Sequence, residues 1–308
     1  MFPFSRFSRY FIEVARHGSL RKAADSLGIS ASAINRQILS VEESLEVPLF
    51  DRLPSGLRLT AAGELLFDDI MRWHKEFMRS CERIDDLKGV SRGRVDIAMI
   101  DAASEGPLAH ALAALGQELP EMVFELHVED NHRIVEKIES GEVDFGILLD
   151  PKESSSLAVH TLIEVPLGIA MAVDHPLAGR KTISLSAVLD ERQMLPAAPL
   201  IVSDAAAALY SRHGVDPHQL SSCDNIRLMR TLIREGAAVG VLSLLDVMPD
   251  LASGQIAFVP FKGSQRHNLS LALCIPPRRQ LSRAAIEAIE RVAKTMASMV
   301  DSNRLSGH

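Results

Sequence analysis

The stretch that most constrains this chain runs from Leu20 to Leu39 and reads LRKAADSLGISASAINRQIL. Within it, Gly28 separates two short segments whose apolar residues recur at helical spacing. Glycine adopts a positive φ without steric penalty, so it can end the first helix, and the hydroxyl of Ser30 can cap the second. The sequence therefore predicts a helix, a tight turn and a second helix that crosses the first closely at Ala23 and Ala24.

The outward side of the second helix indicates what the motif contacts. Its side chains are short, polar and neutral to cationic, and they belong to Ala31, Ser32, Asn35 and Arg36. Such a face can enter the major groove of DNA, where side chains reach base edges and phosphates. Helical hairpins with glycine at the corner also occur in proteins that never bind DNA, so the turn alone leaves both interpretations open.

The flanking residues predict a larger unit around this motif. Phe4, Phe7 and Phe11 recur at helical spacing and indicate a preceding helix, while Val41 and Leu45 extend the second motif helix, with Glu42 and Glu43 on its solvated side. The segment 48–60 has a turn signal between two apolar-alternating arms, which predicts a β-hairpin or wing. Residues of this hairpin that can reach the DNA backbone are Arg52, Ser55 and Arg58; ordinary surface arginines are the alternative interpretation.

The charge distribution limits which part of the chain meets DNA. The net charge of the 308 residues is −7, but residues 1–60 carry +2 and the remainder −9. An acidic body with a mildly basic head predicts that only the head contacts phosphate. The sequence has neither an apolar run of transmembrane length nor a signal peptide, so we expect a cytoplasmic protein with no membrane partner. Its three isolated cysteines favour neither disulfides nor zinc.

Residues 4 to 65 resemble the winged helix-turn-helix of LysR-type transcriptional regulators. The matching motifs are Arg9-Tyr-Phe11, Gly18-Ser-Leu20, Ala23-Ala24, Leu27-Gly28-Ile29-Ser30, Ala33-Ile34, Arg36-Gln37-Ile38, Glu42, Pro48-Leu49-Phe50-Asp51-Arg52 and Leu59-Thr60-Ala61-Ala62-Gly63. The family often has Gln-Pro at the second and third positions of the helix and Ser before the Arg, where this chain has Ala31, Ser32 and Asn35. Ala31 offers only apolar contact to a thymine methyl group, so the resemblance implies the docking mode but not the operator sequence.

A long amphipathic helix is predicted between residues 60 and 88. Its apolar side chains step by three and four residues, which gives one stripe along about seven turns. The resemblance implies that this stripe pairs with its copy in a second subunit through Leu66, Ile70, Trp73, Phe77 and Ile84. Packing of the stripe on the chain's own domains is the alternative.

Beyond a short joint at 89–94 the pattern changes to alternating strands and helices, which predicts parallel sheets flanked by helices. Strands are expected at 95–100, 123–129 and 144–149, and then at 168–173, 200–202 and 239–242, with a helix after Ser184. A last strand at 268–274 and a helix at 282–299 return to the first unit. Two lobes joined by crossings near Ile163 and Gln265 resemble periplasmic binding proteins and the LysR-type effector domain, which Ser140 to Gly146, His175 to Ala178 and Val239 to Val241 also match.

The predicted architecture is α/β overall and has three parts. They are an all-α winged helix-turn-helix at 1–62, a linker and dimerisation helix at 63–90, and a two-lobed periplasmic-binding-protein-like effector domain at 91–308. The first lobe covers about 91–163 and 267–300, and the second lobe about 164–266.

An effector site is predicted in the crevice outside the carboxyl ends of the strands. Its candidate residues are Asp101, Ala102, Ser104, Asn131, Ser203 and Val239. Helix N-termini at these ends favour an anion, but Asp101, Glu105, Asp130 and Asp204 fall there too, so we expect a neutral or amine-bearing effector. The alternative is that these acids cap helices and face solvent.

The sequence has no G-x-S-x-G, H-E-x-x-H, P-loop or G-x-G-x-x-G motif, and its histidines show no metal-ligand spacing. We therefore predict no catalytic residue, metal or cofactor. The favoured interpretation is a homodimeric or homotetrameric LysR-type regulator that binds double-stranded DNA and senses a small molecule. The alternative is a solute-binding or catalytic α/β protein with an incidental helical head.

Overall fold

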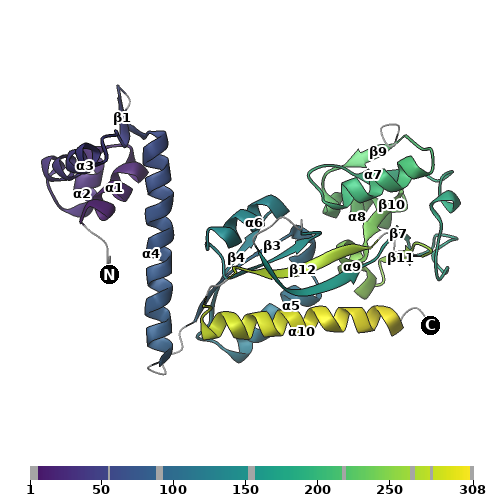
Figure 1. The fold of residues 1–308 in the computed structure, drawn as a ribbon. Helices are drawn as coiled ribbons and strands as arrows, with labels where there is room; N and C mark the ends of the chain where they lie inside the picture. The colour runs from purple at the N-terminus through teal and green to yellow at the C-terminus, as the bar shows by residue number, and fades with distance from the viewer. Residues whose placement is uncertain are drawn as a thin grey trace. The chain divides into compact units, whose positions relative to one another are not determined.

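The computed structural model describes residues 6–54, 56–87, 93–151, 157–216, 220–263, 268–277 and 280–305. The chain divides into two compact units, residues 1–90 and 91–308 (Figure 1). Residues 89–92 of the predicted joint at 89–94 lie outside the described residues. Within these ranges, no helix combines the length and the apolar character needed to cross a membrane.

Three helices form the head, as predicted: α1 (Arg6–His17), α2 (Leu20–Leu27) and α3 (Ala31–Leu45). Gly28 ends α2 with φ 67°, in the left-handed region that glycine tolerates. The hydroxyl of Ser30 accepts from the N–H of Ala33 at 3.3 Å and so caps α3. The fully buried Phe11 packs against Phe50, with ring centroids 5.2 Å apart, and closes the core of the head. The helix-turn-helix is thereby confirmed.

The predicted wing is a two-stranded antiparallel hairpin of β1 (Phe50–Leu53) and β2 (Gly56–Leu59). The N–H of Leu57 donates to the carbonyl of Gly18 at 2.8 Å, which joins the hairpin to the corner between α1 and α2. Gly56 has φ 133°, and a Cβ there would lie 2.5 Å from the Gly18 oxygen. Only glycine allows this close approach. Ser55, at the tip, lies outside the described residues.

Glu42 does not point to solvent as its position in the helical pattern suggested. It is half-buried, and its Oε1 accepts from the N–H of Leu49 at 2.7 Å and from that of Phe50 at 3.2 Å. The prediction was wrong because helical periodicity cannot reveal the free N–H groups of a neighbouring strand, which a carboxylate satisfies well. Glu42 therefore ties α3 to the start of the wing.

The long helix is confirmed as α4 (Ala61–Leu87), with 27 residues. Thr60 precedes it, and its hydroxyl accepts from the N–H of Gly63 at 3.0 Å. The first turns of α4 complete the core of the head. Ile70 is only 2% exposed there, and Leu66 packs beside it.

The first lobe of the second unit is a mixed five-stranded sheet in the order β4-β3-β5-β12-β6. Its strands are β3 (Arg94–Met99), β4 (Val123–Val128), β5 (Phe145–Leu149), β6 (Ala158–Val165) and β12 (Leu269–Ile275). The first three run parallel, and β12 is antiparallel to β5 and β6. Helices α5 (Pro107–Glu118) and α10 (Arg283–Leu305) cover one face, and α6 (Asn131–Glu139) covers the other (Figure 1).

The second lobe is a five-stranded sheet in the order β11-β7-β10-β8-β9. Its strands are β7 (Leu167–Ala172), β8 (Gln193–Pro196), β9 (Ser221–Cys223), β10 (Val239–Ser243) and β11 (Ile256–Pro260). Strands β8, β9 and β10 are parallel, and β7 is antiparallel to β10 and β11. Its helices are α7 (Val202–Arg212), α8 (Ile226–Arg234) and α9 (Leu244–Ala252).

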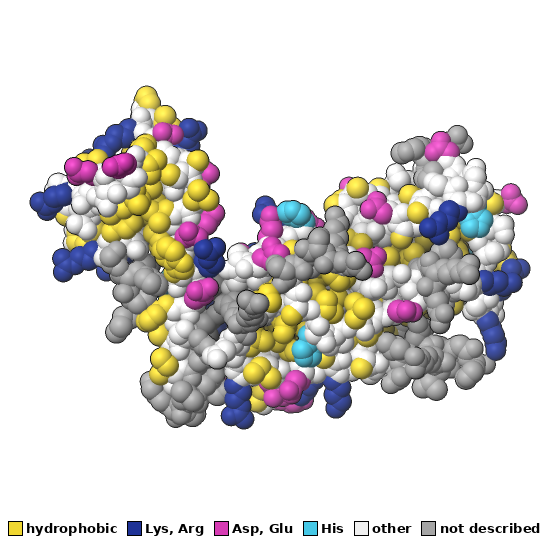
Figure 2. Space-filling view, in the orientation of Figure 1, with side chains coloured by type: hydrophobic (Ala, Val, Ile, Leu, Met, Phe, Trp, Pro, Cys, Tyr) yellow, Lys and Arg dark blue, Asp and Glu magenta, His cyan; other side chains and the backbone are white. Residues whose placement is uncertain are grey.

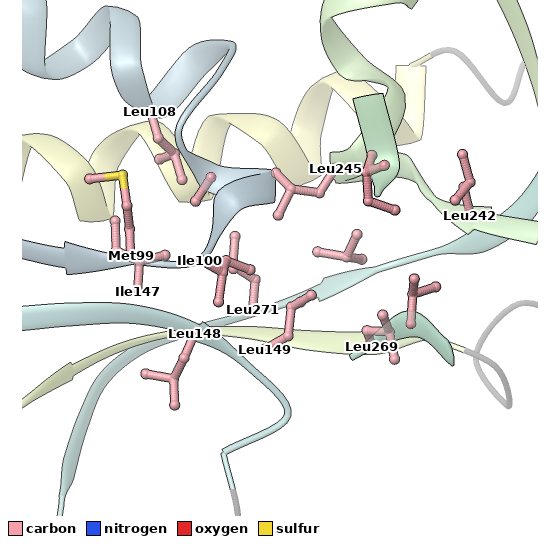
Figure 3. Close-up of a cluster of buried hydrophobic side chains, with 14 of the residues drawn as sticks. Met99, Ile100, Leu108, Ile147, Leu148, Leu149, Leu242, Leu245, Leu269 and Leu271 are labelled. Atoms are coloured by element: carbon pink, nitrogen blue, oxygen red, sulfur yellow. The ribbon is translucent and has the colours of Figure 1, made fainter. Parts of the chain in front are cut away.

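One hydrophobic core runs through both lobes. Figure 3 shows Ile100, Leu149 and Leu271 of the first lobe in the same cluster as Leu242 and Leu245 of the second. The chain passes between the lobes at Pro166, and it returns between β11 and β12 through a segment of which 264–267 lie outside the described residues. This shared core holds the two sheets in one unit.

Two predicted elements of the second lobe are wrong. Residues 200–202 are not a strand but the turn that opens α7, and β8 is the strand at this place. The helix after Ser184 is a single 3-10 turn, Leu185–Ala187. Short apolar runs are compatible with either a strand or a helix, so only the surrounding packing decides. The helix α9 was missed because Pro249 lies inside it, and proline normally argues against a helix.

Candidate DNA-binding face and effector cleft

The exposed side of α3 carries the polar residues that the sequence placed there. Ser32 and Arg36 are exposed and Asn35 is half-buried, one helical turn from Ser32. Ser30, exposed at the start of α3, lies beside Ser32 with the two hydroxyl oxygens 3.2 Å apart. Figure 2 shows Lys and Arg side chains, with Asp and Glu among them, on the part of the molecule that contains this head. Ala31 is the exception, because it is half-buried and packs against the head core rather than facing outward.

The hairpin carries two exposed arginines, and each has a partner. Nη2 of Arg52 donates to Oδ1 of Asn35 at 2.9 Å, so β1 and α3 are joined by their side chains. Nη2 of Arg58 lies 3.4 Å from Oδ2 of Asp51, across the hairpin. Both arginine side chains are exposed. The helix and the wing thus present donor groups together, as contact with a phosphate backbone and base edges requires.

The apolar stripe of α4 is divided between two roles. Leu66 and Ile70, predicted to pair between subunits, instead cover the core of their own head. The reason is that the three short head helices leave an apolar face open, and the first turns of α4 close it. Farther along, Trp73 is 43% exposed and Ile84 52% exposed, and Phe77 is half-buried. Leu65 and Met78, which the stripe did not include, are also exposed.

A cleft of about 370 Å³ lies between the two lobes. The first lobe contributes Asn131 and Asp150, which follow the carboxyl ends of β4 and β5. The second lobe contributes Ala198, Pro199, Leu200, Ile201, Ser203, Asp204 and Ala205, which follow β8 and open α7. The structure thus brings two of the predicted effector residues, Asn131 and Ser203, into one cavity.

Asp150 lines the cleft but was missed by the sequence analysis. It has φ 44°, and its Oδ1 accepts from the N–H of Ser270 at 2.6 Å. Its position directly after a buried parallel strand was the available signal, since the same rule selected Asp101 and Asn131. The amide of Asn131 is itself engaged, because its Nδ2 donates to the carbonyl of Leu149 and its Oδ1 accepts from the N–H of Leu149 at 3.3 Å.

The predicted residues after β3 face a different partner. Asp101 and Ala102 lie in the 3-10 turn Asp101–Ala103, and the hydroxyl of Ser104 donates to the carbonyl of Asp101 at 2.7 Å. None of these three residues lines the cleft. Instead Oδ1 of Asp101 lies 3.3 Å from Nη2 of Arg227, which stands on α8 in the other lobe.

A second arginine of α8 extends this contact between the lobes. Nη1 of Arg230 lies 2.6 Å from Oε2 of Glu105, and its Nε pairs with Oδ2 of the buried Asp250. Burial lowers the pKa of Arg230, but its hydrogen bonds to Glu105 and Asp250 outweigh this, so the guanidinium stays charged. Of the strand-end acids that the sequence placed at the crevice, Asp101 and Glu105 do not line the cleft, because they pair with Arg227 and Arg230 of α8. These partners lie 126 and 125 residues away along the chain, so no local pattern indicates them.

The other three predicted positions, Asp130, Val239 and Asp204, have different surroundings. Asp130 caps α6 by accepting from the N–H of Arg133 at 3.0 Å. Val239 is buried at the amino end of β10, beside Gln193 of the parallel strand β8. The cleft follows the opposite, carboxyl end of β8, so the structure does not bring Val239 to it. Asp204 is exposed at the cleft, and its carboxylate has no hydrogen bond or ion pair to any residue within the described ranges.

Metal binding has no support in the described part of the chain, where no three His, Cys, Asp or Glu side chains are grouped to hold an ion. One buried acid does lie beside the pairs between the lobes. Asp246 accepts from the N–H of Ser243 at 2.9 Å, and burial raises the pKa of its carboxyl group, although Ser243 and the charge of Arg230 act in the opposite direction. It completes the N-terminal cap of α9.

Two family models together match nearly the whole chain. Residues 6–64 match the model described as bacterial regulatory helix-turn-helix protein, lysR family, and residues 88–297 match the LysR substrate binding domain. Similar curated proteins include the DNA-binding transcriptional dual regulator OxyR of Escherichia coli, 25% identical over 85% of this chain and 86% of its own length. The RuBisCO operon transcriptional regulator of Allochromatium vinosum is 26% identical over 83% and 84%.

Solved structures show the same fold. Full-length CbnR in complex with its target DNA has 21% identity and a TM-score of 0.66, and covers 94% of this chain and 99% of its own. A full-length OxyR variant from Pseudomonas aeruginosa has 20% identity and a TM-score of 0.63, with coverage of 94% and 93%.

Proposed function

Because the chain belongs to the LysR family of bacterial transcriptional regulators, we propose how its two units do this work: the α3 face and the hairpin bind an operator, and the cleft between the lobes receives the effector. One observation supports operator binding by the α3 face. The polar residues Ser32, Asn35 and Arg36 share the outward side of a capped helix, with Arg52 beside Asn35. This is the geometry with which a recognition helix reads the major groove.

We propose that two copies associate through the second half of α4. Trp73 and Ile84 are large and exposed in the single chain, whereas Leu66 and Ile70 before them are used by the head. An exposed apolar stripe on a long helix is stabilised by pairing with a copy of itself. Pairing places two heads on one DNA duplex, so that two weak half-site contacts act as one strong contact. A homodimer, or a homotetramer built from it, working in the cytoplasm is the proposed state.

We propose that the effector is a small compound with an amine. The charged side chains that line the cleft are Asp150 and Asp204, and none of its described lining residues is basic. Two arginines of the second lobe that reach the first lobe, Arg227 and Arg230, are already paired with acids. Leu200 and Ile201 offer apolar contact, and the first turn of α7, which has no side-chain cap, offers N–H groups to a carboxylate. An amino acid offers an amine to the two acids, a carboxylate to the N–H groups of α7, and a side chain that can contact Leu200 and Ile201.

Binding would act on DNA by stabilising one arrangement of the lobes over another. A ligand that contacts Asn131 and Asp150 on one lobe and Ser203 and Asp204 on the other has contacts that depend on their separation. Such a ligand shifts the equilibrium by its difference in affinity for the two arrangements. We propose no catalytic activity for the chain.

A peroxide-sensing disulfide is not part of this proposal, although several similar proteins are named hydrogen peroxide-inducible genes activators. Cys274 is fully buried, and burial raises the pKa of its thiol to about 11, so little reactive thiolate forms. Cys223 lies in the sheet of the other lobe. Burial thus favours a structural role for Cys274.

The DNA half of the proposal is tested by retardation of upstream DNA from the source genome with the full chain at increasing salt. We expect Arg36→Ala to weaken binding to all sequences and to lower the slope of log affinity against log salt by about 0.9, the value for one phosphate contact. An Arg36→Ala protein with unchanged affinity and slope would contradict the docking mode.

The effector half is tested by calorimetry with matched amines, amino acids and dicarboxylates. We expect amine-bearing compounds to bind, and Asp204→Asn to weaken them. Asp190→Asn serves as the matched control, because Asp190 is an exposed acid of the same lobe outside the cleft lining. Tight binding of a dicarboxylate that Asp204→Asn leaves intact would exclude the proposed effector class.

A further inference from the structure

The hydrogen bond between Arg52 and Asn35 fixes which way the asparagine amide points. A guanidinium group only donates hydrogen bonds, so the atom of Asn35 that faces it must be the carbonyl oxygen. The 2.9 Å contact from Nη2 of Arg52 to Oδ1 of Asn35 has this polarity. The amide nitrogen, with its two donors, then points away from the wing. The orientation of this side chain is therefore chemically determined rather than an arbitrary choice between two flips.

The orientation matters because Asn35 stands in the middle of the recognition face. It is flanked there by Ser32 and Arg36, one helical turn apart, and both are exposed. A free asparagine reads adenine with two bonds, accepting from N6 and donating to N7. That contact needs Oδ1 and Nδ2 in front of the same base edge. With Oδ1 held toward β1, only the donors of Nδ2 remain in front.

We propose that Arg52 is a positioning residue that turns Asn35 into a donor toward the groove, so that Asn35 selects guanine over adenine. Guanine presents two adjacent acceptors, N7 and O6, to such a donor. Adenine presents N7 beside the N6 amino group, which would face the Asn35 amino group as donor against donor. The inference rests on the DNA-binding function and adds the base that one position of the operator carries.

The competing outcome is that Arg52 leaves Asn35 for a phosphate when DNA binds. Arg52 is exposed, and arginine binds phosphate well. In that case Asn35 would recover its bidentate contact and select adenine. The two outcomes differ in one base of the selected site, so a single selection experiment separates them.

The experiment is affinity selection of the full chain on a random-sequence duplex library, repeated with Asn35→Ala, Arg52→Ala and Arg52→Lys. We expect one base pair in each half-site to lose its preference in Asn35→Ala, and we expect guanine at that position for the wild type, by about tenfold over adenine. Arg52→Ala should change the preference there to adenine. Arg52→Lys should keep guanine, because the lysine ammonium group also only donates.

The matched control is Arg58→Ala, which removes the other exposed arginine of the same hairpin. We expect it to weaken binding to all sequences while leaving the base preference unchanged, as loss of a phosphate contact does. Adenine selected by the wild type, or the same base selected by wild type and Arg52→Ala, would overturn the inference. A wild-type chain that retains no duplex at all would instead contradict DNA binding itself. Melting temperatures of the variants, measured alongside, identify any that fail to fold.

Discussion

The head and the effector domain use their charged and polar side chains in opposite ways. In the head, Ser32, Arg36 and the paired Asn35 and Arg52 lie on the surface and contribute little to its core. In the effector domain, Arg230 is 15% exposed and joins Glu105 of one lobe to Asp250 of the other. The head keeps its polar groups available for an external partner, whereas the effector domain uses many of its own to hold two lobes together.

This difference predicts which substitutions cost stability and which cost only function. Removing an exposed group that binds DNA leaves the free energy of unfolding almost unchanged. Removing one member of a buried pair leaves the other charge without compensation. The same contrast divides α4, where Ile70 serves the fold and Trp73 is free to serve assembly.

We expect the largest effect from substitutions in the exposed part of α4. Trp73→Glu combined with Ile84→Glu puts charge into the proposed subunit contact, so we expect a monomer in analytical ultracentrifugation. Loss of the linked second head should reduce operator affinity on the order of 10²–10⁴-fold.

The control for this prediction is Ile70→Ala, three residues before Trp73. Because Ile70 is buried in the head, we expect this variant to lose about 2–5 kcal/mol of stability of the head. A Trp73, Ile84 double variant that remains a dimer would place assembly elsewhere in the chain.

The second prediction compares a buried and an exposed arginine of α8 in the effector domain. Arg230→Gln leaves Asp250, only 5% exposed, without its main partner, and we expect a loss of about 3 kcal/mol in the free energy of unfolding in urea. Arg227→Gln removes an arginine that is 64% exposed on the same helix. It should cost at most about 1 kcal/mol. Equal losses for the two variants would show that burial does not distinguish these pairs.

The smallest expected effect concerns pH and Asp246. Burial raises the pKa of this carboxyl group above its usual 3.8, so the folded state binds the proton more tightly than the unfolded state. The resulting stabilisation is fully present below pH 3.8 and is lost as pH rises through the raised pKa. Asp246→Asn cannot titrate, so we expect its stability relative to wild type to increase with pH from 4 upward.

The slope of that difference has a limit of about 1.4 kcal/mol per pH unit, the value for one titrating group. Chemical denaturation at several pH values measures it. The groups that act on Asp246 are Ser243 of its own helix cap, Arg230 of α8 and Asp101 of the other lobe. A constant difference between Asp246→Asn and wild type across this range would show that Asp246 stays ionised in the folded state.

The sequence predicted the head better than the cleft, and the residues show why. Gly28 and Ser30 act on the helices directly beside them, so their effect follows from backbone sterics and a cap three residues long. The 27-residue helix α4 follows equally from a repeating pattern. In the effector domain, the strand-end rule found Asn131 and Ser203, which do share a cavity, but it also selected Val239, which does not.

Sequence by itself determined the helix-turn-helix, the wing and the long helix, because capping, glycine conformation and apolar spacing act over a few residues. The two α/β lobes followed from the alternation of strands and helices together with the resemblance to known two-lobed domains. Only the tertiary structure decided which side chains are free. Arg227 meets Asp101 across 126 residues of chain, Glu42 turns inward to the wing, and Ile70 is taken by the head. Such pairings depend on how the whole chain brings distant segments together, and no local pattern contains that information.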